Sequence, residues 1–231
     1  SLHGRGVFLK PQYLLSDGEI ELLVRVFVGL GVHKVRLTGG EPLLRPGFVD
    51  LVNRIASIEG ITDLALTTNG VLLPRHAQAL RTAGLGRITI SLDSLDDTVF
   101  RQMAGNRGSV NEVLAGIEAA ENAGFKTLKI NTVVQRNIND HTIMDLVAHF
   151  RNSGHTVRLI EFMDVGNVNH WNREQVVPSA DLLKTVHDRW SLRPVAQQPL
   201  GETARRYAFT DGAGEIGFIS SITEPFCGDC S

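Results

Sequence analysis

Short runs of β-branched and large apolar residues alternate along the chain with longer amphipathic segments, and this alternation limits the possible folds more than any other feature. Each run is bounded by Gly, Asn or Asp, as is typical of short strands. Strands that alternate with helices at this spacing predict a parallel sheet whose connections are helical crossovers. We expect these strands at residues 35–37, 64–67, 88–92, 128–134 and 157–162.

The helices between the strands have recognisable ends in the sequence. Ser16 and Glu19 form a capping-box pattern ahead of an apolar periodic segment, and Gly31 follows as a C-terminal stop. Ser109 and Glu112 repeat the capping-box pattern before a second such segment. The remaining helices are expected at residues 48–58, 74–83 and 141–152.

This alternation allows either an open doubly wound sheet or a complete or partial (β/α) barrel. Polar residues recur at the C-terminal ends of the strands, the end that carries the catalytic groups in (β/α) barrels. We therefore favour a barrel-type fold over residues 1–166. Residues 167–231 would form a C-terminal region with a loop at 167–171, a helix at 179–190 and strands at 205–209 and 215–220. The polar strand ends are 38–41, 67–69, 91–93, Asn131 and 161–164.

The composition excludes some classes of function. With 42% hydrophobic and 21% charged residues and a net charge of −2, the chain lacks the basic surface of a nucleic-acid-binding protein. The longest apolar stretch, residues 20–32, is interrupted by Glu21 and Arg25 and is shorter than the roughly 18 residues of a membrane span. We expect a cytoplasmic protein without membrane contact.

The two cysteines of the chain, Cys227 and Cys230, are separated by two residues. This spacing is typical of metal ligation or of a redox pair rather than of a structural disulfide framework. It is compatible with a reducing compartment. Two thiolates are too few for a complete metal site, so the pair by itself is a weak signal for a zinc or iron–sulfur centre.

The segment 38–42, Thr-Gly-Gly-Glu-Pro, directly follows the first expected strand. Gly39 and Gly40 have no side chain, so their backbone can approach a ligand closely. Glu41 offers a carboxylate that suits an ammonium group, and the segment lacks the Gly-Lys-Ser/Thr ending of a phosphate-binding P-loop. A tight glycine-rich turn without a ligand is the alternative interpretation.

Three cations lie inside expected strands, where apolar residues are the rule: Arg36, Lys129 and Arg158. A charge in such a strand is costly to bury unless it faces a partner or a ligand. Lys129 alternates with its apolar neighbours and should point away from them, into the barrel. Phosphates or a carboxylate would suit these cations. Internal ion pairs with Glu41, Glu161 or Asp93 would explain them equally well.

Taken together, these motifs resemble the radical S-adenosylmethionine (SAM) GTP 3′,8-cyclases of molybdenum cofactor biosynthesis, the MoaA family. The resemblance extends from about Phe8 to Ser231. It rests on segments 36–45, 67–70, 91–93 and 161–166, and on segment 226–230, which is similar to the start of the family's C-terminal cluster motif.

The resemblance implies an incomplete TIM-type (β/α) barrel of the radical SAM kind and a lyase with two 4Fe-4S clusters. In this family the N-terminal cluster binds SAM and cleaves it to a 5′-deoxyadenosyl radical. The radical removes hydrogen from the ribose of GTP, which then closes onto the base, while the C-terminal cluster helps to hold the purine. The product would pass to a downstream cyclic pyranopterin monophosphate synthase, and the family is compatible with a homodimer.

The resemblance also assigns roles to residues whose motifs match, and it names no catalytic side chain. The SAM site would include Gly40 and Glu41 at the methionine moiety, together with Ser91 and Met163. The GTP site would include Lys34, Arg36, Thr67 and Lys129, with the cations facing the triphosphate. The C-terminal 4Fe-4S cluster would bind Cys227 and Cys230, and the role of Arg158 is open.

Two parts of the family pattern are missing from the sequence. The Cys-x3-Cys-x2-Cys motif should precede Phe8, and a third cluster cysteine with an Arg-x-Arg motif should follow Cys230. We expect both to lie beyond the ends of this sequence.

The sequence leaves two other interpretations of the function. One is a radical SAM enzyme with another substrate, against which Lys129 and segment 161–166 argue. The other is an inactive homologue that binds a nucleotide.

Overall fold

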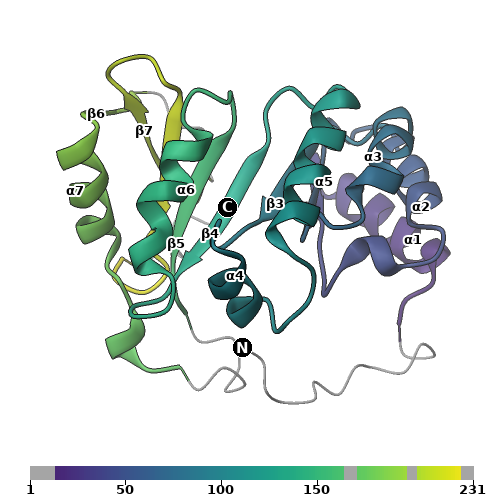
Figure 1. Ribbon diagram of the computed structural model, residues 1–231. Coiled ribbons are helices and arrows are strands. Elements are labelled where there is room, and N and C mark those ends of the chain that lie inside the picture. The colour runs from purple at the N-terminus through teal and green to yellow at the C-terminus, as the bar shows by residue number, and fades with distance from the viewer. Residues whose placement is uncertain (1–13, 164–170, 197–201, 225–231) are drawn as a thin grey trace. The chain divides into compact units, whose positions relative to one another are not determined.

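The computed structural model describes residues 14–163, 171–196 and 202–224 (Figure 1). The chain divides into two compact units. Of the described residues, the N-terminal unit comprises 14–90 and 111–128, and the C-terminal unit comprises 91–110, 129–163, 171–196 and 202–224. The boundary that we expected near Gly166 lies outside the described residues, so the division at that position stays a prediction.

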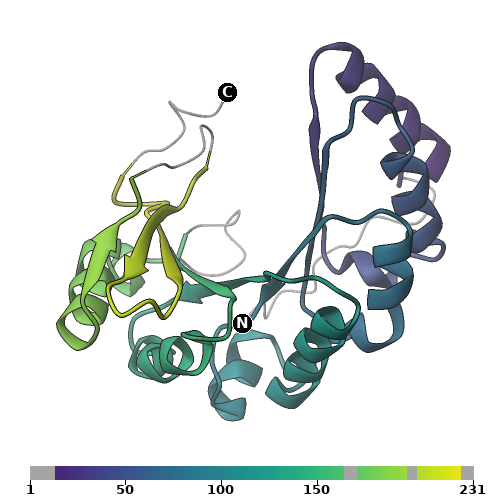
Figure 2. The ribbon, with the colours of Figure 1, turned by 90° about the horizontal axis from the view of Figure 1, so that it is seen from above.

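The N-terminal unit contains a parallel sheet in which β2 pairs with β1 on one side and with β3 on the other. The helices that follow these strands lie together on one side of them (Figure 2). The strands are β1 (Lys34–Leu37), β2 (Asp63–Thr68) and β3 (Arg87–Ser91). The helices are α1 (Asp17–Gly29), η2 (Pro42–Leu44), α2 (Phe48–Ala56), α3 (Leu73–Thr82) and α5 (Val110–Asn122).

The predicted capping box at the start of α1 is confirmed. The Glu19 backbone N–H donates to Ser16 Oγ at 3.3 Å, and the Ser16 N–H donates to the Glu19 carboxylate at 2.7 Å. Together these bonds satisfy two backbone groups that a helix end leaves without partners. The helix stops before Gly31, whose φ of 92° is accessible to glycine at little cost.

One close contact in this unit is made by two glycines. Helix α5 passes so close to the turn after β2 that a Cβ on Gly116 would lie 2.1 Å from the carbonyl oxygen of Gly70. Gly70 itself has a φ of 83°. The contact therefore lets α5 pack directly against the C-terminal end of β2, where polar residues of the candidate site begin.

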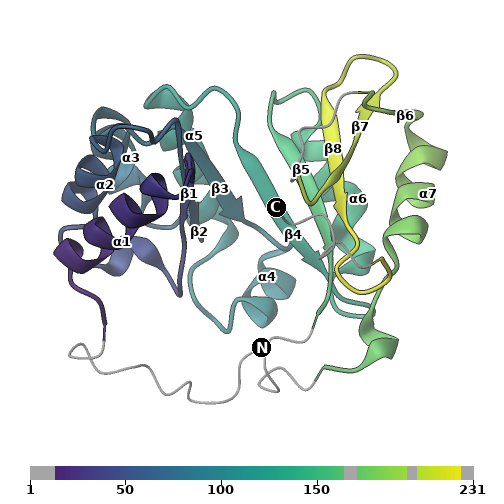
Figure 3. The ribbon, with the colours of Figure 1, turned by 180° about the vertical axis from the view of Figure 1, so that it is seen from behind.

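The C-terminal unit contains a mixed sheet with the strand order β4-β5-β8-β7-β6. The first two pairings are parallel and the last two are antiparallel, and Figure 3 shows this sheet from the face opposite to α6. The strands are β4 (Lys129–Val134), β5 (Thr156–Glu161), β6 (Leu192–Pro194), β7 (Arg205–Phe209) and β8 (Glu215–Ile219). The helices are α4 (Asp97–Met103), η3 (Asp140–Thr142), α6 (Ile143–Phe150), η4 (Arg173–Gln175) and α7 (Ser179–Arg189).

The sequence prediction missed helix α4 and strand β6, and each omission has a physical reason. Asp96 caps α4 by accepting from the N–H groups of Thr98 and Val99, a pattern visible in the sequence but followed by only two turns of helix. Strand β6 contains Pro194, which argues against a strand in the sequence. It pairs only with β7 among the described strands, and such an edge position tolerates proline.

Glu161, at the end of β5, organises the segments around α7 and after β8. Its buried carboxylate accepts hydrogen bonds from the backbone of Ser179 (2.7 Å), Ile222 (2.8 Å) and Thr223 (2.9 Å) and from the Thr223 hydroxyl (2.6 Å). Burial alone would raise the pKa of Glu161, but these four donors outweigh it and lower the pKa. The carboxylate is thus a structural acceptor.

Residues 92–93 lie along β4. The Leu92 N–H donates to the carbonyl of Asn131 at 2.9 Å, and the Val133 N–H donates to the Asp93 carboxylate at 2.8 Å. The Asn139 side chain donates to the Asp93 carbonyl at 2.7 Å. Burial raises the pKa of Asp93 to about 6, although the bond from Val133 acts in the opposite direction.

Asp93→Asn should stabilise the protein at pH 7.5 and have little effect near pH 4. The pKa of Asp93 rises from 3.8 in the unfolded chain to about 6 in the fold, so ionisation opposes folding. Stability is therefore lost as pH rises from about 4 to 6, and the cost above pH 6 is about 3 kcal/mol. The neutral amide avoids this cost and still accepts from Val133. Urea unfolding at both pH values measures the difference.

Asp50→Asn, on the exposed surface of α2, is the matched control and should show no such pH dependence. If Asp93→Asn changed the free energy of unfolding equally at both pH values, the ionisation of Asp93 would not be the cause of its effect.

Candidate functional site

The strands of the N-terminal unit have an apolar face and a polar face. Residues that pair across parallel strands point to the same side of the sheet. Leu64, Leu66, Ile88 and Ile90 occupy the buried apolar face. The opposite face carries three rows of paired residues: Lys34 with Asp63, Arg36 with Ala65 and Arg87, and Thr67 with Thr89. Hydroxyl and charged groups therefore gather on the face of the sheet that lies opposite the apolar core.

Arg36 links these rows. Its Nη1 donates to the hydroxyl of Thr67 at 3.0 Å and to that of Thr89 at 3.1 Å. Burial lowers the pKa of Arg36 and the neighbouring Arg87 lowers it further, yet a guanidinium remains protonated in proteins. Two of the predicted GTP ligands, Arg36 and Thr67, are thus in direct contact, and Lys34 lies two residues away on the same face.

Glu41 holds the turn after β1 in shape. Its Oε1 accepts from the Leu43 N–H at 3.0 Å and from the Thr68 hydroxyl at 2.7 Å, and its Oε2 accepts from the Asn69 N–H at 2.8 Å. The carboxylate thereby caps η2 and joins the turn to the end of β2. The sequence analysis considered Glu41 as a ligand-binding carboxylate and as a partner for the strand cations, and it missed this structural role.

Gly39 and Gly40 lie in the same turn, where the backbone is open. A Cβ added to either residue would meet no described atom within 4 Å, and neither residue has a positive φ. The packing of the described residues therefore does not require glycine at these positions. Side-chain-free backbone beside open space leaves room for a ligand to approach.

In the C-terminal unit, two arginines lie on either side of a glycine. Arg158 of β5 pairs with Gly217 of β8, and Gly217 pairs with Arg206 of β7, so the three residues form one row on one face. A Cβ on Gly217 would lie 3.3 Å from Cγ of Arg158. Lys129 of β4 lies on the same face. We call Lys129, Arg158, Arg206 and Gly217 the cation niche.

The carboxylate of Glu202 lies in the cation niche. Its Oε1 is 3.2 Å from Lys129 Nζ and 2.8 Å from an Arg158 amino group, and its Oε2 is 3.2 Å from Arg206 Nε. Burial alone would raise the pKa of Glu202, but the three cations outweigh it and lower the pKa. The carboxylate that Lys129 and Arg158 share is therefore Glu202, which the sequence analysis did not single out.

The carboxylates considered as partners from the sequence have other contacts: Glu41, Glu161 and Asp93 all accept from backbone N–H groups. The alternative interpretation, that the strand cations pair within the chain, therefore describes Lys129 and Arg158 in this structure, but their partner is Glu202 and not one of the carboxylates that it named. Glu202 is 73 residues from Lys129 in sequence, and no local pattern marks the contact.

The other predicted site residues are divided between the two units. Gly40 and Glu41 belong to the N-terminal unit, whereas Ser91 and Met163 belong to the C-terminal unit. Ser91 is half-buried at the end of β3, and the Met163 side chain is exposed just after β5. Cys227 and Cys230 lie outside the described residues.

Two further searches of the described part of the chain bear on function. No group of three or more His, Cys, Asp or Glu side chains there is arranged to hold a metal ion. No helix within the same ranges has the length and apolar character needed to cross a bilayer.

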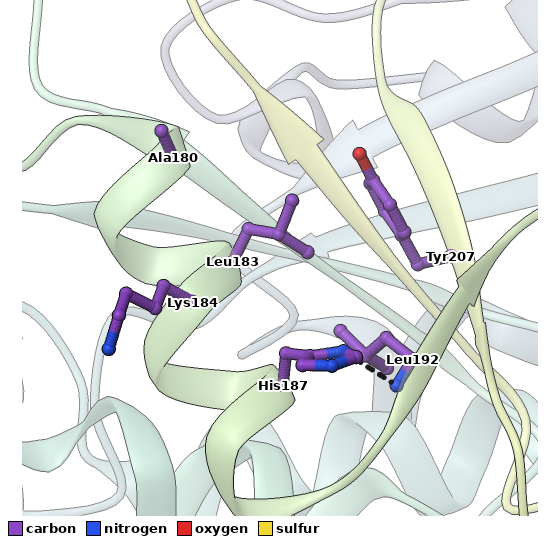
Figure 4. Close-up of a pocket in the computed structure, with 6 residues that line it drawn as sticks. All are labelled: Ala180, Leu183, Lys184, His187, Leu192 and Tyr207. Carbon is purple, nitrogen blue, oxygen red and sulfur yellow. Dashed lines mark hydrogen bonds between the residues drawn. The ribbon is translucent and has the colours of Figure 1, made fainter.

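A separate pocket lies between α7 and the strands β6 and β7 (Figure 4). Its lining is mostly apolar, and His187 is held there because its Nδ1 accepts from the Leu192 N–H at 3.1 Å. None of the residues predicted to bind SAM or GTP lines this pocket. The lining residues are Ala180, Leu183, Lys184, His187, Leu192 and Tyr207.

Two family matches together cover almost the whole chain. Residues 4–150 match the Radical SAM superfamily, and residues 155–231 match the family described as Molybdenum Cofactor Synthesis C. Among solved structures, SuiB of Streptococcus suis bound to S-adenosylmethionine is similar with a TM-score of 0.63 and 17% identity, over 79% of this chain and 43% of that one. Methylornithine synthase (PylB) is similar with a TM-score of 0.57 and 18% identity, over 76% and 53%.

These matches confirm the predicted fold class, an incomplete TIM-type (β/α) barrel of the radical SAM kind. A GTP 3′,8-cyclase of Xanthomonas campestris pv. campestris is 59% identical over 94% of this chain, and the chain spans 64% of that relative's length. A GTP 3′,8-cyclase of Synechococcus sp. is 47% identical over 96% of the chain and 69% of its own length. The chain therefore belongs to the radical SAM superfamily and, within it, to the family of the GTP 3′,8-cyclases.

Proposed function

We propose that the protein acts as a radical SAM lyase that converts GTP to (8S)-3′,8-cyclo-7,8-dihydroguanosine 5′-triphosphate, the first step of molybdenum cofactor biosynthesis. The observation that carries this proposal is the cation niche, because three converging cations suit a triphosphate. Relatives of the same name, at up to 59% identity, support the choice of GTP.

Each unit by itself has a polar face with groups that suit a nucleoside triphosphate. In the N-terminal unit, Lys34, Arg36 and Thr67 offer two cations and a hydroxyl. In the C-terminal unit, Lys129 and Arg158 lie on adjacent strands, and Asn131 pairs with Arg158. The Asn131 Oδ1 is buried without a hydrogen-bond partner among the described residues. A buried acceptor of this kind calls for a donor, which a ribose hydroxyl or a guanine N–H would provide.

The turn after β1 supports a role in SAM binding. The open backbone at Gly39 and Gly40 can approach the methionine moiety, and Glu41 keeps that backbone in place through its three hydrogen bonds. Each carboxylate oxygen has more than one acceptor site, so Glu41 can also accept from the SAM ammonium group. Ser91 and Met163 would complete this site.

The cluster chemistry fits the chain in part. Cys227 and Cys230 have the spacing of iron–sulfur ligands and would hold the C-terminal 4Fe-4S cluster, but they are the only two cysteines present. When bound, the clusters and SAM supply the radical that removes a hydrogen atom from GTP. The described side chains bind and orient the substrate: they hold the triphosphate by charge and the ribose by hydrogen bonds.

Two related functions remain as outcomes of the tests below. An inactive homologue would bind GTP without cleaving SAM, and a radical SAM enzyme with another substrate would cleave SAM without converting GTP. We further propose that the product serves a cyclic pyranopterin monophosphate synthase and that the active protein is a homodimer.

The first test compares the parent with Cys227→Ser in protein that also carries the family's N-terminal cluster motif. Without oxygen and with a reductant, the parent should form 5′-deoxyadenosine and cyclised GTP. Cys227→Ser should reduce cyclised GTP more than 5′-deoxyadenosine, because Cys227 is assigned to the substrate-side cluster. Chromatography of both products from one reaction measures the split. Equal loss of both products from a folded variant would contradict that assignment.

Gly40→Ala should weaken SAM binding by about tenfold or more without lowering the melting temperature. The added methyl group meets no described atom of the protein, so the fold should tolerate it, but it would occupy the space of the bound methionine moiety. Calorimetric titration with SAM and a melting curve give the two quantities. Gly18→Ala, in α1 and also beside open space, is the control. If Gly40→Ala bound SAM as tightly as the parent does, the turn after β1 would not be part of the SAM site.

Lys129→Ala should weaken GTP binding by about 10- to 150-fold, the value of one charge-assisted hydrogen bond. Guanosine binding should change little, because guanosine has no phosphate for Lys129 to contact. Titration of both ligands measures the difference. Lys184→Ala, which removes a lysine paired with Asp188 on the surface of α7, is the control. Equal weakening of GTP and guanosine would show that Lys129 acts through the fold rather than on the phosphate.

A further inference from the structure

The cation niche and its carboxylate are attached to different kinds of backbone. Lys129, Arg158 and Arg206 belong to strands β4, β5 and β7, whose pairing fixes their positions. Glu202 precedes β7 and lies outside every strand. The hydrogen bonds and ion pairs that hold Glu202 within the described residues all involve its carboxylate. The strand pairing therefore fixes the backbone of the three cationic residues, whereas the Glu202 carboxylate can leave the niche without breaking a strand pairing.

We propose that Glu202 is a counter-ion displaced by the substrate: its carboxylate holds, in the ligand-free protein, the place of a phosphate group of the nucleotide, and Arg206 is a third phosphate ligand beside Lys129 and Arg158. This inference rests on the proposed function and extends it to two residues, Glu202 and Arg206. The ligand class is a polyphosphate, either free or as part of a nucleoside triphosphate.

The contacts of Glu202 support this exchange. One carboxylate uses both oxygens to contact three cations, as a phosphate oxygen pair would. The Glu202 side chain is only 12% exposed, so a second anion cannot bind the same cations while it stays in place. Gly217 contributes no side chain between the two arginines, and a Cβ there would lie 3.3 Å from Cγ of Arg158 and 3.3 Å from Cβ of Ala204, so glycine lets the Arg158 side chain lie close against β8.

A displaced counter-ion also has a physical purpose. Three cations near one another on a sheet repel each other, and burying charge without compensation is costly. Glu202 lowers that cost by contacting all three cations, and Glu215, 3.2 Å from Arg206 Nη1, does the same at one of them. Because the low pKa of Glu202 keeps it charged near neutral pH, a weakly charged ligand cannot replace it, and a polyphosphate can.

The test is calorimetric titration of parent, Glu202→Gln and Glu224→Gln with inorganic tripolyphosphate, inorganic phosphate, GTP and guanosine. Glu202→Gln should bind tripolyphosphate about tenfold tighter or more, because no ion pair has to be broken. Inorganic phosphate should gain less, and guanosine affinity should not change. Glu224→Gln is the matched control: Glu224 pairs with Arg205, the neighbour of Arg206 that points to the opposite face of β7, and its loss should leave every affinity unchanged.

Melting curves separate displacement from a structural ion pair. Glu202→Gln should melt at a lower temperature than the parent without an anion, and tripolyphosphate should raise its melting temperature by more than it raises that of the parent. Arg206→Gln, introduced into Glu202→Gln, should weaken tripolyphosphate binding again. If Glu202→Gln does not fold, Glu202→Asp is the second variant. Its shorter side chain keeps the charge, and it should show a smaller gain in affinity for tripolyphosphate.

The outcomes distinguish this inference from the proposed function. If neither Glu202→Gln nor Glu202→Asp binds tripolyphosphate more tightly while GTP still binds in a Lys129-dependent way, Glu202 is only a structural partner and the proposed function stands. If tripolyphosphate binds tightly to Glu202→Gln but GTP is not converted, the niche is an anion site and the proposed reaction is wrong. If the parent and both Glu202 variants bind neither tripolyphosphate nor GTP, both proposals fail.

Discussion

The alternation of side chains along paired strands is the constraint on which the rest of the structure depends. Every second residue of β2 and β3 is buried in the apolar core, so the residues between them must point to the other face. On that face, the hydroxyls of Thr67 and Thr89 accept hydrogen bonds from Arg36. The same alternation in β4 and β5 places Lys129 and Arg158 on one face and Ile130 and Leu159 on the other.

Carboxylates then determine how the polar face is held together, and they do so in two ways. Glu41 and Glu161 accept mainly from backbone N–H groups and thereby fix turns at the ends of strands. The contacts of the Glu202 carboxylate with other described residues are all with cations. This difference separates a structural carboxylate, whose loss would leave buried donors without partners, from one that an anionic ligand can replace.

Much of the fold could be predicted from local patterns. All seven predicted strands are present with ends shifted by at most one residue, and the first capping box is confirmed. The short elements α4 and β6 were not predicted, because two turns of helix and three residues of edge strand produce too little periodicity. The predicted GTP residues Arg36 and Thr67 proved to be in contact, because the strand register places them on one face.

The sequence by itself determined the order of strands and helices, the polar ends of the strands and the motifs of the family, since all of these depend on residues close together in the chain. The tertiary structure alone decided the partners of Lys129 and Arg158. Lys129 meets a carboxylate 73 residues away, and Arg158 and Arg206 come together only because β8, which follows both in the chain, pairs between their strands. Ion pairs over such distances leave no local pattern, because only the pairing of the strands brings the charges within reach of one another.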